Sequence, residues 1–139
     1  MTRVLAFALA CFLVLTGCMS ATEYDSALLG GVDSERIGDG LYKITAQGNR
    51  YTTQRTAEEF AILKAAETAK EAGRGGFLIT DASIRAKQTV YQGGSTQPHS
   101  ANIEMTIELL DGPPGNRPGG KYFDAAEVIE TLGSKHLPR

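Results

Sequence analysis

The segment "TAEEFAILKAAETAKEAGRGGFLI", residues 56–79, decides the fold because it joins a helix-forming run to an apolar run through a glycine-rich stop. Thr56 with Glu59 three residues later is a capping box, in which the hydroxyl and the carboxylate each satisfy a free amide of the first turn. Strong helix formers follow, and three glycines within 73–76 end the run. The sequence therefore predicts an α-helix over 56–72 and a buried strand directly after it.

The predicted helix has an apolar face made almost entirely of small side chains. At 100° per residue that face consists of Ala61, Ile62, Ala65, Ala66, Ala69 and Ala72. A helix with such a face can lie close to a sheet, whereas a coiled coil would prefer Leu and Ile. Phe60 and Leu63 fall outside the face and can touch each other. We expect them either to pack under the C-terminal segment or a loop, or to form a candidate docking surface for a partner.

Three segments around this helix read as strands. Residues 40–49 alternate apolar and polar side chains and end in a Gly-Asn turn, and residues 76–84 form a short apolar run that can continue as far as Tyr91. Residues 101–110 alternate cleanly. Their inward positions are Ile103, Met105, Ile107 and Leu109. A loop over 93–99 makes the last two strands a hairpin.

The C-terminal part reads as an exposed loop followed by a short second helix. Residues 111–120 contain three Pro and four Gly, which excludes a helix or a central strand. Asp124 is then the predicted N-cap of a helix that runs to Leu132. The order is β-α-β-β-α over residues 40–135, a single small α+β domain whose Ala-rich helix packs on one face of a mainly antiparallel three-stranded sheet.

The N-terminus reads as a lipoprotein signal peptide, residues 1–17. One positive charge, Arg3, precedes an uncharged apolar run that is too short to span a bilayer. Leu15-Thr16-Gly17-Cys18 is similar to a bacterial lipobox, in which cleavage between Gly17 and Cys18 leaves a cysteine that carries fatty acyl chains such as palmitate. The alternative is an ordinary secretory signal with an incidental free thiol, which is a liability in an oxidising compartment. Two or three acyl chains would anchor the protein stably.

The mature chain is a short acidic protein. Residues 18–39 are small and polar, and we interpret them as the lipidated N-terminus and a flexible tether. Met19 and Ser20 follow the cysteine where an Asp would favour retention in the inner membrane, so we expect the outer membrane, facing the periplasm. Removal of residues 1–17 leaves 16 acidic residues and a formal charge of −3, which argues against nucleic acid as a partner.

The mature sequence resembles a family of small proteobacterial lipoproteins that is named after a pair of Caulobacter loci. The resemblance covers nearly the whole chain. It is most specific at Tyr42-Lys43-Ile44-Thr45 with Gly48-Asn49, at Phe60 to Glu67 with its Ala65-Ala66-Glu67, and at Phe123-Asp124-Ala125. The family usually has Arg where this chain has Lys64, which leaves the charge unchanged. The resemblance implies a lipid anchor, and the family has no assigned activity that could be carried over to this chain.

No pattern of residues in the chain points to catalysis. The two histidines, His99 and His136, lie far from any second ligand at metal-binding spacing. We therefore expect a non-enzymatic envelope protein, without cofactor or metal, that is attached to the membrane by its lipid and binds an envelope protein or peptidoglycan. The alternatives are a periplasm-facing hydrolase that uses Glu67, Asp81 or His99, and a small-ligand sensor with a pocket between helix and sheet.

The lipobox predicts a specific covalent modification. Intact mass of the protein from detergent-solubilised membranes should equal that of residues 18–139 plus a diacylglyceryl group, with or without an amide-linked acyl chain. The Cys18→Ser variant should lose this modification because it has no thiol to acylate. An unmodified wild-type mass would refute the lipid anchor.

Overall fold

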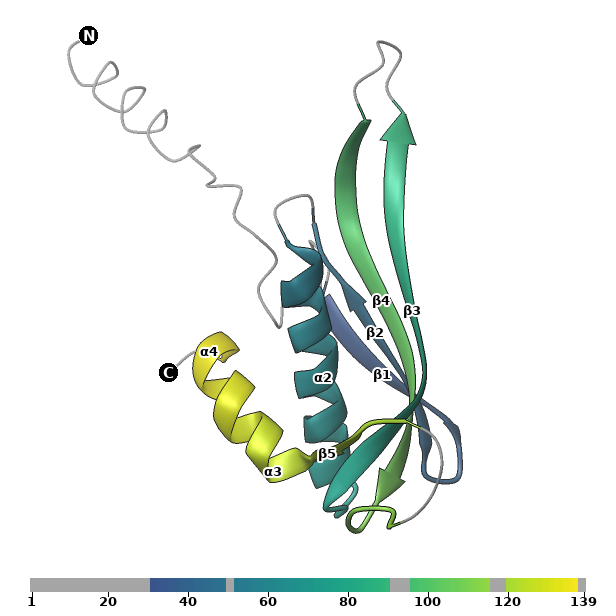
Figure 1. Ribbon diagram of the computed structural model, residues 1–139, viewed down its shortest axis with the longest axis vertical. Helices are drawn as coiled ribbons and strands as arrows, with labels where there is room; N and C mark the ends of the chain where they lie inside the picture. The colour runs from purple at the N-terminus through teal and green to yellow at the C-terminus, as the bar shows by residue number, and fades with distance from the viewer. Residues whose placement is uncertain (1–30, 50–51, 91–95, 116–119, 138–139) are drawn as a thin grey trace, which may run out of the picture.

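The computed structural model describes residues 31–49, 52–90, 96–115 and 120–137, which form an antiparallel sheet with helices on one face (Figure 1). The strands in the described part are β1 (Gly31–Gly38), β2 (Leu41–Gln47), β3 (Gly76–Val90), β4 (Thr96–Leu110) and β5 (Tyr122–Asp124). Their order across the sheet is β1-β2-β4-β3-β5, and each neighbouring pair is antiparallel. The predicted α+β class is confirmed, whereas the three-stranded sheet and the β-α-β-β-α order are wrong because the pattern does not predict β1 and β5.

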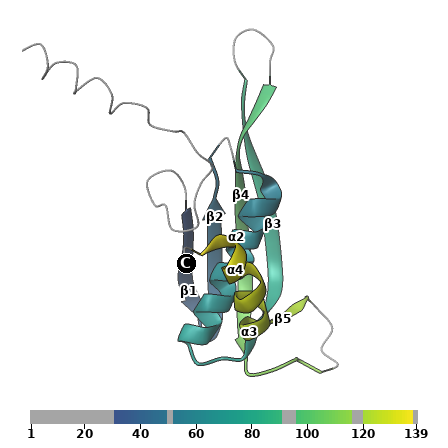
Figure 2. The ribbon, with the colours of Figure 1, turned by 90° about the vertical axis from the view of Figure 1, so that its left-hand side faces the viewer.

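The helices lie on one side of the sheet. They are α2 (Gln54–Glu71) and a C-terminal helix formed by α3 (Ala125–Val128), the π-helical turn η2 (Ile129–Gly133) and α4 (Ser134–His136). Figures 1 and 2 together place the C-terminal helix on the side of α2 that faces away from the sheet, so α2 lies between them. The opposite face of the sheet is not covered by any helix of the described residues.

Strand β1 corrects the expected tether. Residues 31–38 pair with β2 from Gly31 opposite Gln47 to Gly38 opposite Leu41, so the tether predicted over residues 18–39 cannot extend beyond residue 30. The pattern conceals this strand because its two large apolar residues, Val32 and Ile37, lie five positions apart and so do not share a face. Residues 31–38 therefore belong to the folded domain and not to the tether.

Helix α2 begins two residues earlier than predicted. Its N-cap is Thr53, whose hydroxyl oxygen accepts a hydrogen bond from the backbone N–H of Thr56 at 3.1 Å. The predicted cap at Thr56 is therefore wrong, and Thr56 lies within the first turn. The end of the helix agrees with the prediction: Ala72 is the C-cap, and Gly73 has the left-handed φ of 70° that favours glycine.

The buried face of α2 is wider than the predicted alanine stripe. Ala61, Ala65, Ala66 and Ala69 are fully buried as predicted, but Ala72 is exposed and Ile62 only half-buried. Phe60 and Leu63 are 4% and 0% exposed and belong to the hydrophobic core. Their assignment to a docking surface is therefore wrong. Phe60 packs under the C-terminal segment, with its ring edge-to-face against His136 at a centroid distance of 4.9 Å.

Strands β3 and β4 form a long hairpin that projects past the rest of the sheet (Figures 1 and 2). The strands predicted over 76–84 and 101–110 are confirmed, the first with its continuation as far as Val90, and Ile103, Met105, Ile107 and Leu109 are buried as predicted. Residues 96–99 belong to β4 rather than to the expected loop. The pairing between β2 and β4 ends at Gln47 opposite Asn102, so the outer half of the hairpin is a two-stranded arm.

Strand β5 fixes the start of the C-terminal helix. It pairs with Gly76–Leu78 at the beginning of β3, where a Cβ on Gly76 would overlap the carbonyl oxygen of Phe123. Phe123 stacks on Phe77 with a centroid distance of 5.3 Å. Asp124 is the N-cap, as predicted, and accepts a hydrogen bond from the backbone N–H of Glu127. The prediction that the helix ends at Leu132 is wrong, because it continues to His136.

Burial of Leu63 predicts a large loss of stability on truncation. Leu63→Ala should lower the free energy of unfolding by about 2–5 kcal/mol, because it removes a fully buried side chain and leaves a cavity. Ile37→Ala is the matched control, since Ile37 is 51% exposed and its truncation should cost less than about 1 kcal/mol. Urea unfolding of both variants checks this. Equal small losses in the free energy of unfolding for the two variants would show that Leu63 is not buried.

Candidate functional site

An open groove of about 610 Å³ lies between α2, β5 and the C-terminal helix. Its apolar lining comes from Ile62 of α2, Phe123 of β5, and Val128 and Leu132 of the C-terminal helix. Polar residues at its edges are Glu59, Lys121, Tyr122, Asp124, Glu127 and Thr131. This volume falls within the usual range for ligand pockets, and an apolar floor with few polar groups is typical of binding sites.

The polar rim has a mixed but mainly acidic character. The ammonium group of Lys121 lies over the Phe123 ring, 4.7 Å from its centroid, which is a cation–π contact. Partial burial raises the pKa of the Tyr122 hydroxyl, and the negative charge of Asp124 adds to the effect. Tyr122 is therefore a neutral hydroxyl at this rim at physiological pH, beside the exposed carboxylates of Asp124 and Glu127.

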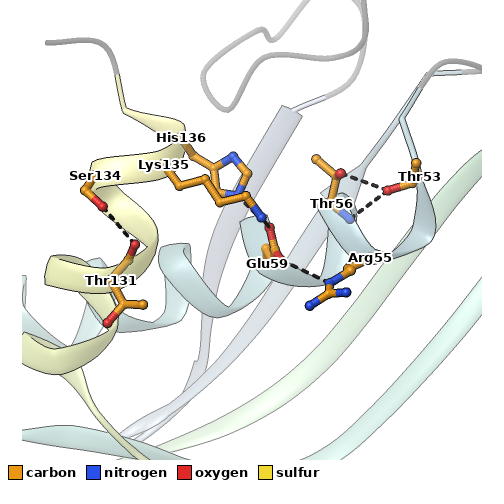
Figure 3. A network of polar contacts seen from close by, with 8 residues as sticks. All are labelled: Thr53, Arg55, Thr56, Glu59, Thr131, Ser134, Lys135 and His136. Atoms are coloured by element: carbon orange, nitrogen blue, oxygen red, sulfur yellow. Dashed lines mark hydrogen bonds and ion pairs between the residues drawn. The ribbon is translucent and has the colours of Figure 1, made fainter.

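Glu59 joins α2 to the C-terminal helix at one end of the groove (Figure 3). Its Oε2 accepts a hydrogen bond from Lys135 Nζ at 2.6 Å and lies 2.7 Å from His136 Nε2. Its Oε1 lies 3.4 Å from Nε of Arg55, one turn earlier on α2. The side chains of Glu59 and His136 are 15% and 11% exposed, so the contact is largely shielded from water. This carboxylate holds the last turn of the chain against α2.

The pKa of Glu59 reflects these contacts. The hydrogen bond from Lys135, then that of His136, lowers the pKa of the Glu59 carboxyl below its ordinary value of 4.5, although burial opposes the shift. A carboxylate with a lowered pKa stabilises the folded state at any pH above the unfolded-state value. The stabilisation is lost as the pH falls through the folded-state value.

The residues considered for hydrolysis are not brought together. Glu67 is half-buried on α2, 4.0 Å from the ammonium group of Lys64. Asp81 is exposed on β3 opposite Thr106, on the sheet face away from α2, so the sheet separates it from Glu67. His99 belongs to β4 and not to a loop, and the structure does not describe its side chain.

The lipidation site, Cys18, and the cleavage position after Gly17 lie outside the described residues. In the described part, no helix is long and apolar enough to cross a membrane. Residues 31–49, 52–90, 96–115 and 120–137 also contain no group of three or more His, Cys, Asp or Glu that could hold a metal ion. The prediction of a lipid anchor therefore stays a prediction from the sequence.

Sequence reasoning missed both the groove and the Glu59 contact. The apolar stripe of the second helix was a usable signal, because Val128 and Leu132 lie one turn apart on one face. The contact of Glu59 with Lys135 and His136 spans more than 75 residues of sequence, and no local pattern reports it.

No protein-family model matches this chain, and the searches of curated proteins and of solved structures found no match to it.

Removal of the Glu59 charge should loosen the C-terminal helix in a pH-dependent way. Glu59→Gln should lower the free energy of unfolding by about 1 kcal/mol at pH 7, since it removes the charge-assisted contacts with Lys135 and His136. The difference from the wild type should persist down to the ordinary carboxyl pKa of 4.5 and vanish as the pH falls further, through the lowered pKa of Glu59 in the folded state. Thermal unfolding across this pH range checks it.

Glu58→Gln is the matched control, because Glu58 is on the same helix and accepts a hydrogen bond from Gln54 of that helix. Hydrogen exchange of residues 125–136 should accelerate in Glu59→Gln and not in Glu58→Gln. Equal exchange in the two variants would show that Glu59 does not hold the C-terminal helix.

Proposed function

We propose that this protein is a non-enzymatic lipoprotein of the bacterial envelope, anchored through Cys18 in the outer membrane and facing the periplasm, whose domain binds another envelope component in the groove. The observation that carries the binding role is the groove itself, with its apolar lining from Ile62, Phe123, Val128 and Leu132. The anchoring role is supported by Leu15-Thr16-Gly17-Cys18 and by the resemblance to the small proteobacterial lipoproteins.

The short tether limits where the partner can be. Since β1 begins at Gly31, residues 19–30 separate the proposed anchor from the folded domain. A flexible segment of that length has a root-mean-square reach of about 20 Å. An anchored domain would therefore stay close to the lipid headgroups, and its partner would have to lie at or near the same membrane surface.

The chemistry of the groove favours a polypeptide partner. Glycan strands are covered with hydroxyl groups that an apolar floor could not satisfy. A protein segment can place one or two apolar side chains on that floor, and basic residues beside them would meet the exposed carboxylates of Asp124 and Glu127. We therefore assign to the groove an apolar segment of an envelope protein flanked by Lys or Arg.

Site-specific photo-crosslinking in living cells tests this role. A photoreactive residue at Lys121, which lines the groove and is exposed, should give a defined adduct with an envelope protein. Thr131→Trp should lower the adduct yield by roughly tenfold, because a bulky side chain at the exposed rim would fill the groove and cost the partner at least about 1.4 kcal/mol.

Thr45→Trp is the control, since Thr45 lies on β2 opposite Asp33, on the sheet face away from the groove. It should leave the adduct unchanged. Equal yields from the two tryptophan variants, or the absence of any adduct, would refute the groove as a binding site. Intact mass of Cys18→Ser separately tests the anchor.

A further inference from the structure

Strand β3 has a long edge that no described strand pairs with. Strand β5 pairs with Gly76–Leu78, and Ile79 donates its backbone N–H to Lys121 O at 3.2 Å. Beyond that point, among the described residues, β3 has a neighbour only on its β4 side as far as Val90. An unpaired edge of this length is a template for strand addition.

Two irregularities in β3 bound a regular segment of this edge. The register shifts between Ile79 and Asp81 and again between Ala86 and Gln88. Bulges are devices by which proteins interrupt edge pairing. The regular stretch between them is therefore Asp81–Ala86, and any added strand has to pair there.

The backbone groups that face this free edge follow from the hydrogen bonds of β4. Leu109 donates its N–H to Gly40 O at 2.8 Å, so the polar backbone groups of Leu109 face β2. Alternation then turns those of Glu104 toward β3, where Ser83 lies opposite. The N–H and C=O groups of Ala82 and Ile84 must therefore point away from β4, to the free edge.

The amino-acid sequence of the same segment is self-complementary in charge. Asp81 and Arg85 lie two residues before and two residues after Ser83 and carry opposite charges. If a second copy pairs antiparallel with Ser83 opposite itself, Asp81 of each copy lies opposite Arg85 of the other. The same register places Ala82 opposite Ile84, which is the geometry of a hydrogen-bonded pair, because both residues turn their backbone groups outward.

We propose that two copies of this chain associate through β3, in antiparallel pairing, with the two-fold axis at Ser83. The pairing joins two five-stranded sheets into one continuous sheet. It brings the two Ile84 side chains, each 51% exposed in the single chain, into diagonal contact across the axis. The contact is short, so it is weak in solution and is strengthened when both copies are held on one membrane. It does not involve the groove.

Disulfide trapping in the full-length protein tests the register. Ser83→Cys should form a disulfide-linked dimer in membranes under mild oxidation. The two copies of residue 83 would face each other as a non-hydrogen-bonded pair, whose Cα atoms lie about 4.5 Å apart, within the range of a disulfide. Thr45→Cys, on β2, and the wild type with Cys18 as its native mature cysteine are the controls and should stay monomeric on a non-reducing gel.

Charge reversal tests the complementarity. In the Ser83→Cys background, Asp81→Arg and Arg85→Asp should each lower the dimer yield by roughly tenfold, since each replaces two opposite-charge pairs with two like-charge pairs. The combined swap Asp81→Arg with Arg85→Asp should restore it. Three results would overturn the proposal: equal trapping of Ser83→Cys and Thr45→Cys, failure of the swap to restore the dimer, or a Ser83→Cys adduct with a different protein.

Discussion

The close approach of α2 to the sheet is the constraint on which the rest of the structure depends. Ala61, Ala65, Ala66 and Ala69 are fully buried, and their small side chains let the helix lie directly on β2 and β4. Alanine by itself buries little apolar area, so larger residues must supply the core. They come from the strands, with Ile44, Phe77 and Ile107 fully buried, and from Phe60 and Leu63, which lie on α2 outside the alanine face.

Because Phe60 and Leu63 lie outside the alanine face, a second element has to cover them. The C-terminal helix supplies this cover: Ala125 and Val128 join the same core cluster, His136 packs on Phe60, and the Glu59 carboxylate holds Lys135 and His136. The groove lies along this contact, because Glu59 and Ile62 of α2 line it together with Val128 and Leu132 of the C-terminal helix. Glu59 thus belongs both to the contact between the two helices and to the lining of the groove.

The sheet order has consequences of a different kind. Strand β4 lies at the centre, so it is paired on both sides along Asn102–Glu108, whereas β3 receives only the three residues of β5 on its outer side. The outer face of the sheet is polar, with the Lys43–Glu104 ion pair at 3.3 Å across β2 and β4. An exposed polar face and an open edge next to it are compatible with strand addition at the edge and do not favour a further covering layer.

The sequence by itself determined those features that depend on neighbouring residues: the alanine face and glycine stop of α2, the alternation of β2 and β4, and the cap at Asp124. The sequence did not predict strand β1, because its alternation of apolar and polar residues is weak. Asp39-Gly40, between residues 31–38 and 41–47, is nevertheless a hairpin signal. Only the tertiary structure decided the strand order, the burial of Phe60 and Leu63, and the meeting of Glu59 with Lys135 and His136. These depend on contacts between residues far apart in the chain, which no local periodicity encodes.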